Sequence, residues 1–152
     1  MYKSKPNAIQ RARNRRGLTQ EALAECSGYS VDSIRAWETG ARIASLEALN
    51  ILSDVLNTTW LTVVYLKEQT TALNDLIPEF TVGRPLAEAA ADYINSILDL
   101  IDNRFDRKLL RMIADGHIDE LEEADYQALL EMAGRADKAY FEIRFAQKDK
   151  ED

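Results

Sequence analysis

The sequence reads Leu18-Thr19-Gln20-Glu21-Ala22-Leu23-Ala24, then Gly28, Ser30 and Ile34, and then Trp37-Glu38-Thr39-Gly40. Thr19 and Ser30 have hydroxyl groups that can accept hydrogen bonds from the free N–H groups at the start of a helix. Gly28 and Gly40 stand where helices of this length would end, since glycine tolerates the left-handed conformation found there. The stretch therefore predicts two short helices, over 20–26 and 31–38, joined by a tight turn.

Similar start and stop signals continue on both sides of this stretch. A helix is expected over 7–16, with Gly17 ending it, and another after Ser45. A fifth is expected from Thr58 or Thr59 through Tyr65, although the β-branched run Thr62-Val63-Val64 favours helix weakly. The expected core of the five helices consists of Ile9, Leu23, Ile34, Trp37, Leu49 and Leu52, and Cys26 is expected to be buried as well.

The pattern over about residues 7–66 resembles the Xre family of helix-turn-helix domains, the type found in the Cro and C1 phage repressors. In that family L-[ST]-Q-x-x-L-A is followed by a turn of small residues, a Ser or Thr cap, an Ile, and an ending with Glu and Gly. The resemblance implies a five-helix domain whose third helix lies in the major groove of DNA while the second crosses the backbone. It implies a sequence-specific transcriptional regulator of bacterial or phage origin, most simply a repressor.

The resemblance also implies which residues contact DNA. Gln20 matches the family glutamine that contacts the DNA backbone, and Arg42 follows the turn where the family places basic phosphate contacts. Arg13 matches a helix-one arginine that pairs, in some members, with the glutamate at the position of Glu38. The stretch that would face the groove comprises Ser30, Val31, Asp32, Ser33, Arg35 and Ala36.

Three residues of that stretch depart from the side chains that usually read bases. Val31, Asp32 and Ala36 lack the Gln, Asn or Arg groups that make bidentate base contacts. Val31 could touch a thymine methyl group, and Asp32 could accept a hydrogen bond from cytosine N4. The carboxylate of Asp32 would also oppose binding to phosphate, so weak or lost DNA affinity stays open as an alternative.

The chain beyond the fifth helix has a different pattern. Residues 67–85 are expected to form a linker, because Pro78, Gly83 and Pro85 interrupt any periodicity. Apolar residues then recur every three or four positions over 86–113, which predicts one long amphipathic helix. After the interruption at 115–118, the capping-box pattern Asp119-x-x-Glu122 begins a second long helix.

These two helices are expected to form an antiparallel hairpin over 86–147, followed by a charged tail at 148–152. The turn at 114–122 looks like that of tellurite-resistance-type helical domains. It also looks like C-terminal regions that follow Xre domains in regulators of Gram-positive bacteria and their mobile elements. The expected fold is therefore all-α: a helix-turn-helix domain at 1–66, a linker and a helical hairpin.

The charges are divided unequally along the 152 residues. Residues 1–44 contain eight Lys and Arg against four Asp and Glu, whereas residues 45–152 contain 11 against 22. This division separates a head compatible with DNA phosphates from an acidic body. No stretch is long and apolar enough for a membrane span, and no signal peptide is visible. A single cysteine fits a reducing, cytoplasmic setting.

The composition offers no catalytic constellation, because one His, one Cys and no glycine-rich phosphate loop are present. We therefore expect a protein that is not an enzyme and needs no cofactor or metal. The expected partners are a double-stranded DNA operator and a second copy of the chain, bound through residues 86–147. The alternative is an antitoxin-like or adaptor protein whose acidic body binds a basic partner.

Overall fold

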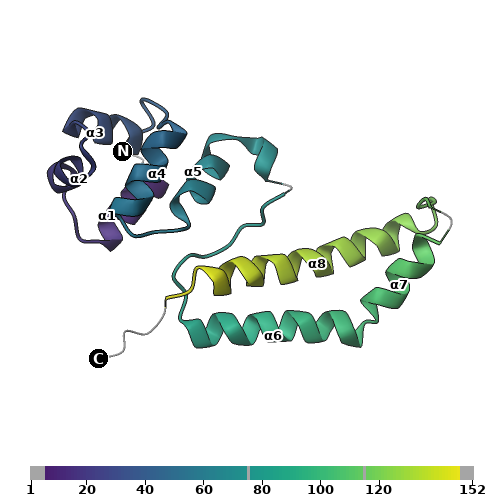
Figure 1. Ribbon diagram of the computed structural model, residues 1–152. Helices are drawn as coiled ribbons and strands as arrows, with labels where there is room; N and C mark the ends of the chain where they lie inside the picture. The colour runs from purple at the N-terminus through teal and green to yellow at the C-terminus, as the bar shows by residue number, and fades with distance from the viewer. Residues whose placement is uncertain (1–5, 75, 115, 148–152) are drawn as a thin grey trace, which may run out of the picture. The chain divides into compact units, whose positions relative to one another are not determined.

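The computed structural model describes residues 6–74, 76–114 and 116–147, and these form eight α-helices, one short 3-10 helix and no strand. The all-α fold class is therefore confirmed. The chain divides into two compact units, Met1–Leu76 and Ile77–Asp152, which we describe separately (Figure 1). The predicted tail at 148–152, and Asp115 in the predicted turn, lie outside the described residues.

The N-terminal unit contains five helices, and polar side chains cap the first four of them, whereas the fifth starts after Trp60 without a side-chain cap. The side chains of Asn7, Thr19, Ser30 and Ser45 each accept a hydrogen bond from a backbone N–H in the first turn of the following helix. These bonds satisfy N–H groups that have no partner inside the helix. The helices are α1 (Ala8–Arg15), α2 (Gln20–Ser27), α3 (Val31–Glu38), α4 (Leu46–Val55) and α5 (Leu61–Gln69), followed by the 3-10 helix η1 (Thr71–Leu73).

The core of this unit is the predicted one. The side chains of Ile9, Leu23, Ile34, Leu49, Leu52 and Trp37 are all buried. Two polar contacts tie distant segments to this core. The Nδ2 group of Asn7 donates to the Trp37 carbonyl at 2.7 Å, and the Ala44 N–H donates to the buried Tyr65 hydroxyl at 3.0 Å.

Cys26 is exposed, so its predicted burial is wrong. The buried face of α2 is centred on Leu23 and Ala24. Successive helix residues are separated by about 100°, so Cys26 points well away from that face. Ala24, rather than Cys26, is buried beside Leu23.

The C-terminal unit contains α6 (Leu86–Asp102), α7 (Phe105–Met112) and α8 (Glu123–Arg144). In Figure 1, α6 and α8 lie side by side and run in opposite directions, while α7 closes the end where the chain reverses. The antiparallel arrangement is as predicted. None of the helices that the structure describes, in either unit, has the length and apolar character needed to cross a membrane.

The prediction of a single long helix over 86–113 is wrong, because the helix is interrupted between α6 and α7. Asn103 ends α6, and its side-chain amide donates to the Asp99 carbonyl at 2.8 Å. Arg104 then adopts a left-handed conformation with φ of 54°. A residue in that conformation cannot continue a right-handed helix, so α7 starts in a new direction.

The start of α8 follows the capping-box pattern, although the helix begins four residues later than predicted. The Asp119 carboxylate accepts the N–H groups of Leu121 and Glu122 at 2.8 and 2.9 Å. The Glu122 carboxylate accepts the Asp119 N–H at 3.4 Å in return. These reciprocal bonds form a turn, and the regular helix starts after it at Glu123.

The predicted linker at 67–85 is divided between the two units. Its first residues extend α5 and form η1, whereas residues from Ile77 onward belong to the C-terminal unit. There Phe80 stacks on Phe141, with the ring centroids 4.9 Å apart, and Arg84 pairs with the buried Glu142. Proline and glycine in this segment prevent helix formation without preventing packing, because side chains between them still reach α8.

Candidate nucleic-acid interface

The turn between α2 and α3 positions the two helices on which a DNA contact would depend. Gly28 ends α2 with φ of 74°, a left-handed conformation that glycine adopts without steric cost. Ser30 then caps α3 only two residues later. Tyr29, between them, packs edge-on against Trp37 at 4.9 Å. The turn is therefore held to the core by an aromatic contact.

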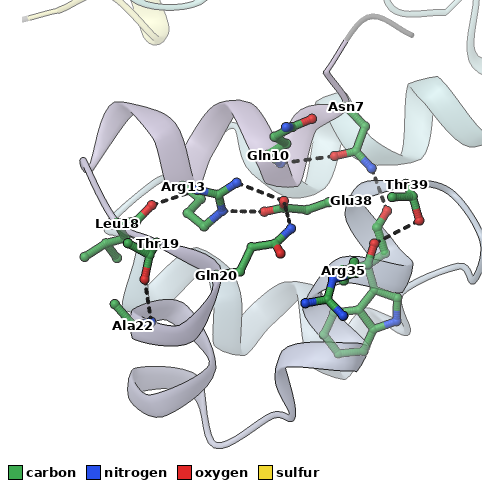
Figure 2. A network of polar contacts seen from close by, with 11 residues as sticks. Asn7, Gln10, Arg13, Leu18, Thr19, Gln20, Ala22, Arg35, Glu38 and Thr39 are labelled. Atoms are coloured by element: carbon green, nitrogen blue, oxygen red, sulfur yellow. Dashed lines mark hydrogen bonds and ion pairs between the residues drawn. The ribbon is translucent and has the colours of Figure 1, made fainter. Parts of the chain in front are cut away.

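A buried ion pair connects α1 to the end of α3. The Nε and Nη2 groups of Arg13 donate to the two carboxylate oxygens of Glu38 at 2.6 and 2.9 Å (Figure 2). The side chains are only 11% and 1% exposed. Arg13 also donates to the Leu18 carbonyl at 2.7 Å. The hydrogen bonds to Glu38 raise the pKa of Arg13 above its ordinary value, so the guanidinium stays charged.

Glu38 accepts a third hydrogen bond, from a second partner at the start of α2. The Nε2 group of Gln20 donates to Glu38 Oε2 at 2.8 Å, and Figure 2 shows Gln20 and Arg13 converging on the same carboxylate. Three helices thus meet at one side chain. A primary amide has two N–H donors. Gln20 can therefore be held by Glu38 and still donate to a phosphate at the N-terminus of α2.

The exposed surface of α3 carries the other polar candidates. Arg35 Nη1 lies 3.0 Å from Asp32 Oδ1, one turn earlier on the helix, and both side chains are exposed. The hydroxyl groups of Ser30 and Ser33 lie 2.9 Å apart. Val31 and Ala36 are half-buried, so they offer less surface to a groove than their positions suggested.

Arg42 and Glu21 adjoin this surface. The guanidinium of Arg42 lies 5.5 Å from the centre of the Trp37 ring, a cation–π distance, and the side chain remains exposed. The pKa of Glu21 is lowered by hydrogen bonds from its own N–H and from the Thr19 hydroxyl, and further by the charge of Arg35. The surface therefore contains carboxylates as well as cations.

The structure brings most of the predicted residues together on α3 and at the start of α2, but it does not place Arg13 with them. Arg13 is enclosed by Glu38 and the Leu18 carbonyl. The predicted pairing of Arg13 with Glu38 is present. The contact between Gln20 and Glu38 was not predicted, because no local spacing links residues 18 positions apart.

These features define a class of protein. A five-helix domain in which two capped helices flank a tight turn, and in which the second of these two helices is exposed to solvent, is a helix-turn-helix domain of the kind that binds DNA. Residues 9–62 match the family model described as "Helix-turn-helix". This model describes the Xre or Cro/C1 type of DNA-binding regulatory domain, and the segment that it matches lies within the N-terminal unit. Searches of curated proteins and of solved structures gave no match to the chain.

Proposed function

We propose that this protein is a transcriptional repressor that binds a two-part operator as a homodimer, with α3 in the major groove. The observation that carries the proposal is the exposed polar surface of α3, held by the Arg13–Glu38–Gln20 network beneath it. A buried and bidentate network of this kind fixes the angle between α1, α2 and α3 before DNA arrives. Occupancy of an operator that overlaps a promoter is then sufficient for repression.

The dimer is proposed from the C-terminal unit, whose core is thin. Among its described residues, Met112 and Leu129 are the large apolar side chains that are buried. Other large apolar side chains remain exposed along α6, where Ile94, Leu98 and Ile101 are 58%, 49% and 64% exposed. Their spacing of four and three places them on one helix face. A second copy covering this α6 stripe would supply the missing core and a two-fold axis for the DNA-binding domains.

A second function has one observation in its favour. Residues 77–152 contain 18 Asp and Glu against 10 Lys and Arg, so the C-terminal unit is strongly acidic. An adaptor or antitoxin-like protein could use such a surface to bind a basic partner. Selection of bound sequences from a random DNA pool separates the two functions. Only the regulator returns an enriched site.

We expect the selected site to contain two related half-sites about 34 Å apart, one turn of B-DNA. Affinity should fall as salt rises, because the positive charge of Arg42 displaces counterions from the phosphates that it contacts. Arg42→Ala should weaken binding to all sequences alike, and placing the site over a promoter should lower expression of a reporter gene. If the folded protein enriches no sequence at low salt, the adaptor function replaces the regulator.

A further inference from the structure

The exposed surface of α3 carries an ion pair between residues one helical turn apart. Arg35 Nη1 and Asp32 Oδ1 are 3.0 Å apart, while the two side chains are 55% and 90% exposed. Exposed pairs of this kind contribute little to stability, because water and salt screen the attraction. The pair matters instead for the charge and the orientation of the guanidinium and the carboxylate.

The pair reduces the repulsion that an acidic residue on a DNA-binding helix would otherwise exert on phosphates. An unpaired Asp32 would repel phosphates and lower the affinity for any duplex. Paired with Arg35, it adds no net charge to the groove-facing surface. The cost is that Arg35 no longer supplies a free positive charge for phosphate. Such a surface favours a partner that satisfies directed hydrogen bonds over one that offers only negative charge.

The guanidinium keeps most of its donors in this arrangement. Only Nη1 is bonded to Asp32, and an arginine has five N–H donors in a planar fork. Two parallel donors remain for the O6 and N7 acceptors of guanine, the base that arginine reads in the major groove. Asp32 limits the rotation of a long side chain, so less freedom is lost when those two bonds form.

We propose that Asp32 is a positioning residue, which holds Arg35 for bidentate donation to one guanine in each half-site and disfavours duplexes without it. The inference rests on the proposed function and adds its base preference. Arg35 touches the base, and Asp32 acts through Arg35. The two residues therefore form one unit, and removal of either should affect the same base pair.

The test compares variants of the full-length chain by selection from a random DNA pool and by competition binding. Arg35→Lys, which keeps the charge but loses the fork, should reduce the preference for that guanine roughly tenfold to a hundredfold. Asp32→Asn should reduce the preference at the same position, by less, and should raise affinity for unrelated duplexes. Asp32→Glu should restore part of the discrimination. The Asp32→Ala/Arg35→Ala double variant should discriminate no worse than Arg35→Ala.

Asp54→Asn is the matched control, because it removes one exposed carboxylate from α4 and should leave the base preference unchanged. Circular dichroism establishes that each variant is folded. Changes at different base pairs for Asp32 and Arg35, or additive losses, would mean that Asp32 reads a base itself and would overturn the pairing. Enrichment of a site whose guanine preference survives in Arg35→Lys would also overturn it. A folded wild type that enriches no site would refute the proposed function and the inference together.

Discussion

Two Arg–Glu pairs of nearly equal length show how burial decides the role of a residue. Arg13 and Glu38 are 2.6 Å apart in the interior, whereas Arg11 and Glu68 are 2.7 Å apart with about 30% of each side chain exposed. Water already solvates the second pair, so losing it costs little. Loss of one partner in the first pair would leave an uncompensated charge inside the domain.

We expect Glu38→Gln and Arg13→Met each to lower the unfolding free energy of the N-terminal unit by about 3–5 kcal/mol. The double variant Arg13→Met/Glu38→Leu should cost less than either, because no buried charge remains. Arg11→Met serves as the control and should cost less than about 1 kcal/mol. Urea unfolding followed by tryptophan fluorescence measures this unit alone, since both tryptophans, Trp37 and Trp60, belong to it. Equal losses for the two pairs would contradict the assignment.

At the scale of elements, the sequence was sufficient to predict a helix boundary where a local hydrogen bond determines it. Thr19 and Ser30 determine the starts of α2 and α3 through a single side-chain bond each, and both were predictable. The break at Arg104 was not, because the three-to-four spacing of apolar residues continues through it. The contact of Gln20 with Glu38 could not be predicted either, since it depends on how separate helices pack.

The left-handed conformation of Arg104 leads to a prediction about the junction of α6 and α7. Arg104→Gly should leave the stability of the chain unchanged or raise it, because glycine adopts this conformation without steric strain. Arg104→Val should lower stability by roughly 1–2 kcal/mol, since a β-branched side chain clashes there with the following carbonyl. Thermal unfolding followed by circular dichroism compares the variants. If valine is tolerated as well as glycine, α6 and α7 form one continuous helix in solution.

At the scale of the whole molecule, the two units differ in how completely they bury their apolar residues. In the N-terminal unit, each of the helices α1 to α5 contributes at least one fully buried leucine or isoleucine, whereas the C-terminal unit leaves the α6 stripe exposed. The first unit can be stable alone. We propose that the second completes its core by association, which is why the proposed dimer contact lies there.

We expect the full-length protein to be dimeric at tens of micromolar and Leu98→Glu to dissociate it, because the change puts a charge in the middle of the α6 stripe. Asn95→Glu is the control, since it introduces the same side chain on the polar side of the same helix. Light scattering gives the mass of each variant, and operator affinity should fall with Leu98→Glu alone. A monomeric wild type, or a Leu98→Glu variant that stays dimeric, would rule out this contact.

The C-terminal unit also closes on itself. The Gln147 N–H donates to the Arg84 carbonyl at 2.8 Å, and the Gly83 N–H donates to the Phe145 carbonyl at 2.9 Å. The segment that enters the unit therefore lies beside the segment that leaves it (Figure 1). We expect a unit closed in this way to tolerate circular permutation, because a short peptide could join the two segments while new termini are made in the turn near 116–118. Because the unit closes through its own backbone hydrogen bonds, we expect it to fold equally well when it is fused behind a different DNA-binding domain.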